Sequence, residues 1–305
     1  MKIVLTGSLG NINRPLIPLL VDAGHSVTVI TRSPDRVPAI EALGAAAAVG
    51  RMQDVDFLTR TFTGADLVYL MEAWEGVGSL FDPAVDFPAG MREIGRSYRE
   101  AVVRSGVTRL VHLSSVGAHT DRNVGSLSVH HDVENILREL PAPVHIKFVR
   151  PVGFFSNLYR SLGTIQGQGA IVQSYGGDRK EPWVAPGDIA ASIARLMAEP
   201  FDGRSVHYVA SEELSPNEVA ATVGEAIGRP DLAWIALPPE ILRERMRELG
   251  MNDWVADGFI AMQAAQADGS LFEDYRRHRP TLGPTKLTDF AREFAAAYHQ
   301  QREQA

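Results

Sequence analysis

Over the first 150 residues, short apolar runs alternate with longer segments whose apolar positions follow a helical period. The strand-like runs cover residues 2–6, 26–30, 45–49, 66–71, 109–114 and 144–149, and the helical segments cover residues 35–43, 56–62, 91–105 and 129–140. Strands and helices that alternate in this way form a parallel sheet with helices on both faces. We therefore predict an α/β fold with a doubly wound parallel sheet.

The pattern changes after Pro151. The rest of the chain contains shorter elements rich in glycine and aromatic residues, and helical patterns at 216–227, 238–249, 252–267 and 286–299. Because the strand–helix alternation does not continue, we predict two units. Residues 1–150 form the sheet domain, and residues 151–305 form a smaller, mostly helical lobe, some segments of which can return to the sheet.

The first strand runs into a turn that contains two glycines, Gly7-Ser8-Leu9-Gly10-Asn11-Ile12. Glycine allows positive φ and close approach of a phosphate, and the start of the following helix offers free N–H groups to an anion. The third position of this dinucleotide-binding fingerprint, usually glycine, is Asn13. We predict that the sheet domain is a Rossmann-type NAD(P)-binding domain and that residues 7–12 contact the cofactor. The alternative is an ordinary tight turn.

The end of the second strand indicates which nicotinamide cofactor binds. An acid at this place binds the ribose 2′-OH of NAD, whereas an arginine accommodates the 2′-phosphate of NADP. This chain has Thr31, Arg32 and Ser33, and Asp35 lies beyond a proline, where it begins the next helix. We therefore favour NADP(H) over NAD(H), with Arg32 and Ser33 as contacts. The alternative is that Arg32 is a solvated surface charge.

Composition narrows the classes of function. The 305 residues include no cysteine, which excludes disulfides and thiolate chemistry, and 30 Lys and Arg against 37 Asp and Glu give a net charge of −7. Without a basic cluster we expect no direct nucleic-acid binding. No apolar run approaches the ~20 residues of a membrane span, so we expect a cytoplasmic protein with no membrane association. The histidine spacing predicts no metal site, and the serine-hydrolase elbow Gly-x-Ser-x-Gly is missing.

Ligands of such sheets lie at the carboxyl ends of the strands. The remaining predicted cofactor contacts at those ends are Met71, Glu72, Pro151, Val152 and Gly153, and Ser114 and Ser115 are expected beside the nicotinamide ribose.

Four aromatic residues are predicted to contact substrate: Trp74 and Phe81 in the loop at 72–88, and Phe154 and Phe155 after the last strand of the domain. They suit a flat, apolar substrate. The alternative is that these aromatic side chains belong to the core.

Several short motifs follow one another in an order that resembles the NmrA-like, atypical branch of the short-chain dehydrogenase/reductase superfamily. They are Thr6-Gly7-x-x-Gly10, Ser114-Ser115-Val116-Gly117-Ala118, His130-x-x-x-Glu134-x-x-Leu137, Arg150-Pro151-Val152-Gly153-Phe154-Phe155-Ser156-Asn157, Asp188-Ile189-Ala190 and Ile227-Gly228-Arg229. The resemblance covers nearly the whole chain. It implies a nicotinamide-binding core, usually for NADP(H), and a C-terminal substrate lobe.

Two departures from the pattern of these relatives affect the site. Relatives often carry an acid after the third strand that contacts adenine, but here Arg51 and Met52 stand there, with Asp54 slightly further on. Arg51 either stacks on adenine, joins Arg32 at the 2′-phosphate, or is a surface arginine.

The second departure concerns catalysis, because the pair Tyr-x-x-x-Lys is replaced by His130 and Glu134. A glutamate cannot stabilise a tyrosinate, so that route of proton transfer is absent. His130 is the candidate proton donor, with Glu134 holding its ring or raising its pKa. The alternative is that His130 and Glu134 form a structural pair. Water, Ser114 or Ser115 would then assist the proton transfer.

The leading hypothesis is an NADPH-dependent reductase that transfers a hydride to a small organic carbonyl, quinone or enone. A sensor that binds NADP(H) and acts through a regulatory protein partner is the competing hypothesis. The sequence is also compatible with a homodimer.

Overall fold

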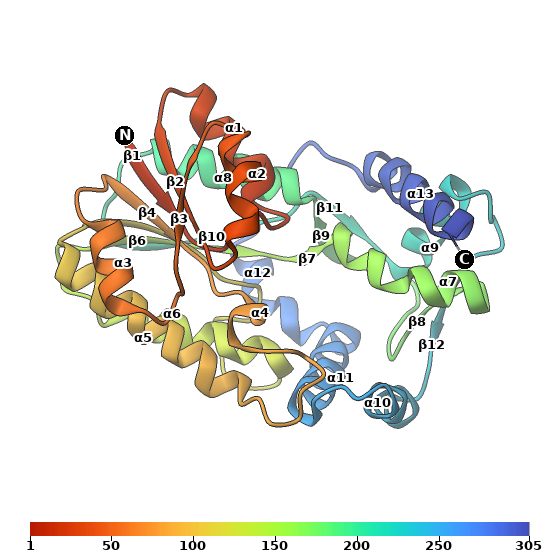
Figure 1. Ribbon diagram of the computed structural model, residues 1–305. Coiled ribbons are helices and arrows are strands. Elements are labelled where there is room, and N and C mark those ends of the chain that lie inside the picture. Colours follow the sequence, from red (N-terminus) through yellow and green to blue (C-terminus); the bar gives the residue numbers. More distant parts are fainter. Residues whose placement is uncertain (305) are drawn as a thin grey trace.

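The computed structural model, which describes residues 1–304, is built around one parallel sheet of seven strands (Figure 1). The sheet has the order β10-β6-β5-β4-β1-β2-β3. Its strands are β1 (Lys2–Leu5), β2 (Ser26–Thr31), β3 (Ala46–Val49), β4 (Leu67–Leu70), β5 (Arg109–Leu113), β6 (His145–Pro151) and β10 (Arg204–Val209). The chain winds from β1 outward to β3 and then crosses to β4, on the other side of β1. The topological switch between β1 and β4 is where such sheets bind ligands.

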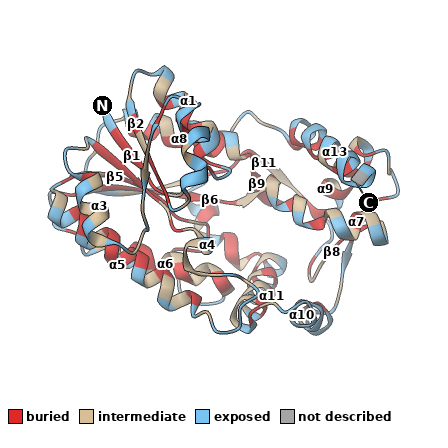
Figure 2. Ribbon diagram, viewed as in Figure 1, coloured by how far each residue is buried: buried red, intermediate tan, exposed pale blue. Residues whose placement is uncertain are grey.

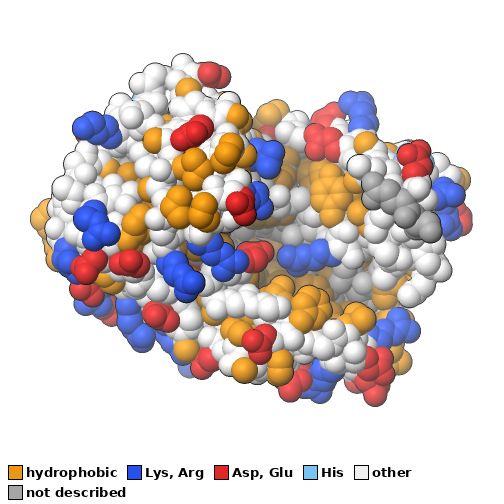
Figure 3. Space-filling model, viewed as in Figure 1, with side chains coloured by type: hydrophobic (Ala, Val, Ile, Leu, Met, Phe, Trp, Pro, Cys, Tyr) orange, Lys and Arg blue, Asp and Glu red, His pale blue; other side chains and the backbone are white. Residues whose placement is uncertain are grey.

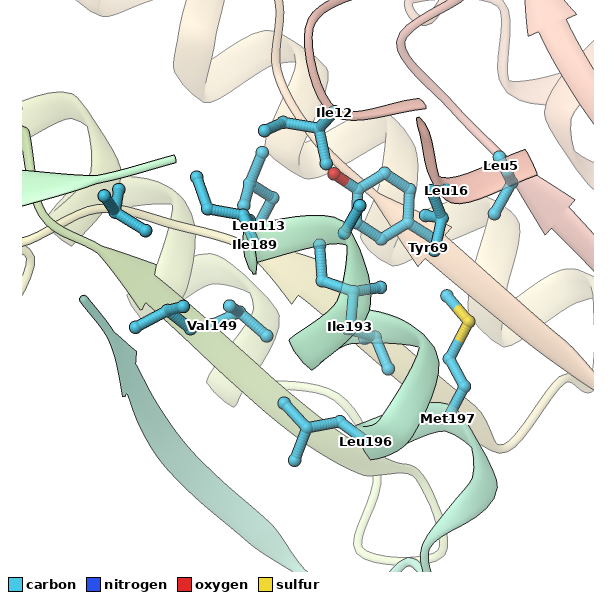
Figure 4. Packing of buried hydrophobic residues seen from close by; sticks show 14 of the residues in the cluster. Leu5, Ile12, Leu16, Tyr69, Leu113, Val149, Ile189, Ile193, Leu196 and Met197 are labelled. Carbon is cyan, nitrogen blue, oxygen red and sulfur yellow. The ribbon is translucent and has the colours of Figure 1, made fainter. Parts of the chain in front are cut away.

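Helices cover both faces of the sheet, which confirms the predicted doubly wound fold. One face carries α1 (Asn13–Asp22), α2 (Val37–Glu41) and α8 (Pro186–Ala198), and the other carries α3 (Val55–Phe62), α5 (Phe87–Ser105) and α6 (Ser128–Arg138). Figure 4 shows the first of these two cores, where Tyr69 and Leu113 of the sheet approach Ile189 and Ile193 of α8. Each such aliphatic side chain contributes roughly 1.5–3 kcal/mol when it is buried.

Residues 151–305 contribute to both units of the molecule. After β6 the chain enters the lobe, and α8 and β10 then return to the sheet domain. β10 pairs in parallel with β6 from Arg204 opposite Ile146 to Val209 opposite Pro151. The two units therefore interleave along the chain, and residue 150 is not a clean boundary between them.

The lobe has its own small sheets and its own apolar core. Its strands are β7 (Gly153–Phe154), β8 (Ala170–Gln173), β9 (Glu181–Val184), β11 (Glu212–Leu214) and β12 (Ala233–Ala236), and its helices are α7 (Leu162–Gln168), α9 (Pro216–Ala226), α10 (Pro239–Glu248), α11 (Asp253–Asp268), α12 (Glu273–Arg277) and α13 (Leu287–Gln304). Buried residues follow the sheet and the inner faces of the lobe helices, whereas α10 is largely exposed (Figure 2).

The remaining elements are short. They comprise the helical turn α4 (Trp74–Val77) and 3₁₀ turns at Pro34–Arg36, Gly125–Leu127, Phe155–Ser161 and Ser270–Phe272. The helix expected at 91–105 begins earlier, at Phe87, because Asp86 caps it by accepting a hydrogen bond from the Ala89 N–H group at 2.9 Å.

Candidate cofactor and substrate site

Gly7 allows the turn after β1 to lie directly against the end of β4. Its φ is +89°, and a Cβ at this position would lie only 2.1 Å from Met71 Sδ. Thr6 joins the same two strand ends, because its Oγ1 accepts a hydrogen bond from the Met71 N–H group at 2.8 Å and donates to the Met71 carbonyl at 3.2 Å. Met71 therefore packs against the turn and leaves room only for glycine at position 7.

Asn13 explains why the fingerprint lacks its third glycine. The buried Asn13 Nδ2 donates to the carbonyl oxygens of Thr6 at 2.7 Å and Ser8 at 2.8 Å. These bonds hold the turn closed onto α1 in place of close backbone packing. Asn13 Oδ1 is buried without a partner among the described residues, an arrangement that costs free energy unless a ligand or water supplies a donor.

The outer side of the turn is open. Gly10 and Asn11 are exposed, and a Cβ on Gly10 would have only the Gly7 carbonyl oxygen near it, at 3.7 Å. Within the described part of the chain, no side chain caps the start of α1. Open backbone beside free helix N–H groups suits a pyrophosphate. Leu9 and Ile12, by contrast, are buried core side chains, so only their backbone is available to a phosphate.

At the end of β2, Arg32 is exposed and Ser33 is partly exposed. Ser8 donates to the Thr31 hydroxyl at 3.0 Å, which ties the phosphate turn to this strand end. Arg32 Nη1 donates to the backbone carbonyl of Glu75 in α4 at 2.5 Å. Within residues 1–304, Arg32 has no carboxylate partner, so its charge is available to an anion.

The two residues predicted after β3 lie differently. Arg51 is exposed. Met52 is partly buried, and its Sδ accepts a hydrogen bond from the Tyr98 hydroxyl of α5 at 2.8 Å. Sequence reasoning did not single out Gln53, whose Nε2 donates to the carbonyl of Gly76 in α4 at 3.0 Å.

The carboxylate of Glu72, a predicted cofactor contact, points into the core. Both of its oxygens lie 3.1 Å from His112 Nε2, and the two side chains are 1% and 0% exposed. His112 thus holds this carboxylate within the core, and the predicted contact of Glu72 with the cofactor stays a prediction. Pro151 and Val152 are likewise buried, and their backbone groups bond to Val116 and Val209 within the fold. Gly153 is partly exposed in β7.

Glu134 is the centre of a buried polar network. Arg150 grips it with two bonds, Nε to Oε1 at 2.8 Å and Nη2 to Oε2 at 2.7 Å, and Ser114 Oγ donates to Oε1 at 2.6 Å. Burial alone would raise the pKa of Glu134, but the hydrogen bonds and charge of Arg150 outweigh it and hold this pKa below its usual range. Arg150 also donates to the Tyr208 hydroxyl and to Asp274 of α12, both at 3.2 Å.

This network corrects the expectation that Glu134 would hold the His130 ring. The carboxylate faces Arg150, and His130 makes no hydrogen bond among the described residues. His130 is partly exposed and its Nδ1 atom is buried without a partner. Burial lowers the pKa of His130, against the opposing charge of Glu72, so its imidazole is neutral at pH 7. Ser115 is partly exposed beside Ser114.

The four aromatic residues predicted to contact substrate differ in how far they are buried. Trp74 packs against Phe87 and Trp254, with ring centroids 5.4 and 6.1 Å away. Phe81 is 55% exposed and Phe154 partly exposed. The surface is hollowed between the sheet domain and the lobe (Figure 3). Phe155 is fully buried in the lobe core and stacks on Trp183 and Phe290, which agrees with the alternative that it is a core side chain.

A cavity of about 330 Å³ is lined in part by Glu134 and Arg150. Its lining includes His119, His131 and His278, which share a polar wall with Arg138 and Asp274. Across residues 1–304, no cluster of histidines and carboxylates has the geometry of a metal site. None of the helices in that range has the length and apolar character that crossing a bilayer demands.

Three solved structures share this architecture. The *Escherichia coli* NADPH-dependent quinone oxidoreductase QOR2, complexed with NADPH, has a TM-score of 0.78 at 20% identity, over 96% of this chain and 99% of that one. The *Citrobacter* sp. triphenylmethane reductase complexed with NADP(H) has a TM-score of 0.71 at 18% identity, over 96% and 99%. NmrA, a negative transcriptional regulator, has a TM-score of 0.73 at 15% identity, over 99% and 98%.

Sequence comparison places the chain in a family. An uncharacterized protein of *Schizosaccharomyces pombe*, C2A9.02, is 24% identical over 250 residues, which cover 75% of this chain and 82% of that protein. The model of the NmrA-like family matches residues 1–290, nearly the full length. This protein therefore belongs to the NmrA-like family.

Proposed function

We propose that this protein is an NADPH-dependent oxidoreductase that reduces a small organic carbonyl, quinone or enone. The observation that carries the proposal is the pairing of an open phosphate turn at residues 7–13 with the exposed Arg32 and no acid at the end of β2. Two structural neighbours, described as a quinone oxidoreductase and a triphenylmethane reductase, are solved with NADPH and NADP(H) respectively. The similarity to these two structures supports the assignment of the fold. The turn at residues 7–13 and Arg32 support the assignment of the cofactor.

The residues present fit NADP(H). The backbone of Gly7 and Gly10 and the uncapped start of α1 suit the pyrophosphate, and Arg32 suits the 2′-phosphate. The unpaired Asn13 Oδ1 is a hydrogen-bond acceptor at the turn that lacks a donor. When bound, the reduced cofactor would supply the hydride, and the protein's part is to orient it, exclude water and provide a proton.

The hydrogen bonds at Ser114 restrict its role. Because its hydroxyl hydrogen is directed to Glu134, Ser114 can accept from a ligand N–H or O–H group but cannot at the same time donate to a substrate oxygen. Among the three catalytic candidates, His130 and Ser115 thus remain as proton donors. We favour His130, because Glu134 is engaged with Arg150 and leaves the imidazole unpaired.

A second candidate, a NADP(H) sensor that acts through a protein partner, is favoured by the same imidazole. The lowered pKa of His130 leaves little protonated imidazole to donate at neutral pH, and NmrA among the neighbours is a negative transcriptional regulator. The reductase has the advantage that Trp74 and Trp254 pack together with both side chains partly exposed, which offers aromatic surface to a flat substrate.

One experiment separates the two functions. NADPH fluorescence is followed on adding the protein and then each member of a panel of quinones, enones and aryl aldehydes, with NADH alongside. Loss of NADPH with one acceptor establishes a reductase and its substrate class. Tight binding of NADPH with no loss across the panel favours the sensor, and no binding of NADPH contradicts both functions.

A further inference from the structure

The short turn α4 contacts the predicted adenosine side of the cofactor site. Two of its backbone carbonyls accept hydrogen bonds from that side. The Glu75 carbonyl accepts from Arg32 Nη1 at 2.5 Å, and the Gly76 carbonyl accepts from Gln53 Nε2 at 3.0 Å. Arg32 follows β2 and Gln53 follows β3, so α4 bridges the ends of two strands that are far from it in sequence.

The same turn carries Trp74, one of the predicted substrate contacts. The Trp74 ring packs on Phe87, the first residue of α5, and on Trp254 in the first turn of α11. α4 also lies close against its neighbours, since a Cβ on Gly90 would lie 2.3 Å from Val77. Any change in the position of α4 is therefore transmitted to the Trp74–Phe87–Trp254 cluster.

The lobe holds the segment that follows α4. Asn252, which is 4% exposed, donates through Nδ2 to the carbonyls of Asp82 at 2.9 Å and Val85 at 3.1 Å. Its backbone N–H group donates to the Leu80 carbonyl at 2.9 Å. Residues 74–85 are thus held at one end by Arg32 and Gln53 of the sheet domain and at the other by Asn252 of the lobe.

The bond from Arg32 to Glu75 uses the side chain that NADP(H) needs. A guanidinium binds a phosphate dianion much more strongly than a neutral carbonyl, because the bond is charge-assisted and can be bidentate. The ribose 2′-hydroxyl of NAD(H) carries no charge and has no such advantage over the carbonyl. Only the 2′-phosphate is therefore expected to draw Arg32 away from α4.

Resting on the proposed cofactor, we propose that the Glu75 carbonyl is an internal competitor of the 2′-phosphate for Arg32. NADP(H), and not NAD(H), releases α4 and alters the Trp74–Phe87–Trp254 cluster, which contains the predicted substrate contact Trp74. The two cofactors therefore differ in how well residues 74–85 are ordered when they bind, as well as in their affinity for the protein. This adds to the usual role of such an arginine, which concerns the phosphate alone.

The test uses two nucleotides that differ only in the 2′-phosphate and carry no nicotinamide: 2′,5′-ADP and 5′-AMP. Hydrogen–deuterium exchange is measured on the full chain for peptides that cover residues 73–86. The amides of Gly76 and Gly78, which bond to Ala73 and Trp74 within the turn, report its opening. With 2′,5′-ADP we expect roughly fivefold faster exchange, the effect of removing one ordinary hydrogen bond, whereas saturating 5′-AMP should leave the rate unchanged.

Two variants make the test specific. Arg32→Ala should show the faster exchange of residues 73–86 before any nucleotide is added, and no further change with 2′,5′-ADP. The matched control is Arg60→Ala, which removes an exposed arginine of α3 that has no bond to α4; this variant should respond to 2′,5′-ADP like the wild type. Tryptophan fluorescence is also measured on adding 2′,5′-ADP to the wild type and to Trp74→Phe. A change that is lost in this variant is assigned to the Trp74–Phe87–Trp254 cluster.

The outcomes are distinct. If 2′,5′-ADP binds but leaves exchange at residues 73–86 equal to that with 5′-AMP, the competition is wrong while the cofactor assignment survives. Unchanged exchange in Arg32→Ala without nucleotide would also overturn it. If neither nucleotide binds, the proposed function fails and the competition fails with it.

Discussion

Arg150 and Glu134 form a two-pronged ion pair in which both side chains are almost completely buried, 6% and 2% exposed. Glu134 stands one helical turn after His130, where a relative with the Tyr-x-x-x-Lys pair would carry the lysine. In this chain Glu134 is paired instead with a cation that comes from the end of β6. The pair orients Ser114 and, through Asp274, joins the sheet to α12 of the lobe.

Removing the charge of Glu134 should strongly destabilise the protein. Glu134→Gln leaves Arg150 buried with only one remaining carboxylate neighbour, so the free energy of unfolding should fall by about 3–5 kcal/mol. Urea denaturation measures it. Asp56→Asn is the control, because it breaks the exposed pair with Arg104 and should change stability by less than ~1 kcal/mol. Equal losses in both variants would contradict a special role for the buried pair.

Arg32→Ala should discriminate between the two cofactors. The loss of charge-assisted bonds to the 2′-phosphate should weaken NADPH binding by roughly 10- to 100-fold, while NADH binding stays the same. Fluorescence titrations of both cofactors measure this. Equal weakening of NADPH and NADH would sink the 2′-phosphate assignment.

Asn13→Ala tests the substitute for the third glycine. Without Nδ2, the carbonyls of Thr6 and Ser8 lose their shared donor, and the free energy of unfolding should fall by roughly 1–3 kcal/mol. NADPH affinity should fall as well, because the turn is no longer held in the phosphate-binding shape. Denaturation and NADPH titration are the measurements, and a variant with wild-type values in both would show that Asn13 does not organise the turn.

His130 predicts a characteristic pH profile for the reductase. Since burial lowers its pKa below 6.5, the protonated donor is scarce at pH 7 and becomes more abundant as the pH falls. Turnover with an acceptor found in the panel should rise toward acid pH and level off below the pKa. His130→Gln should flatten this rise and leave NADPH affinity intact. A rise that persists in the variant would assign the proton to another group.

Glu181 of β9 should make stability fall as the pH rises. It is 5% exposed and has no cation partner among the residues that the structure describes, and burial raises its pKa to about 7 from 4.5, against the hydrogen bonds from Tyr175 and Gln266. The folded state thus holds a proton that the unfolded state releases. The contribution of Glu181 to the free energy of unfolding is complete below pH 4.5 and is lost by about pH 7. This loss amounts to roughly 3 kcal/mol. The difference between wild type and Glu181→Gln, from unfolding at several pH values, isolates it.

The sequence predicted the features that depend on local pattern. Gly7 and Gly10 lie in one turn between a strand and a helix, and the period of apolar residues located the helices of the sheet domain within a few residues. The pairing of Glu134 with Arg150 could not be foreseen in the same way, because both residues looked like separate polar positions of two motifs.

Other differences also arose from contacts distant in sequence. Phe154 and Phe155 are neighbours that face opposite sides, so residue type did not reveal that Phe155 enters the lobe core. The sequence analysis allowed some segments after residue 150 to return to the sheet, but it did not identify α8 and β10 as those segments, since they follow a stretch of irregular elements. The link from Arg32 to α4 uses a backbone carbonyl, for which no residue type is a signal.

The place of β10 at the edge of the sheet has a consequence for biosynthesis. β6 can pair on one side with β5 as soon as it is made, but its other edge finds a partner only when residues 204–209 have left the ribosome. Until then the nascent chain displays a bare strand edge, the kind of surface that recruits other chains. Completion of the nucleotide-binding sheet must therefore wait for part of the lobe to be synthesised, and a chain ending at residue 150 would keep that edge open permanently.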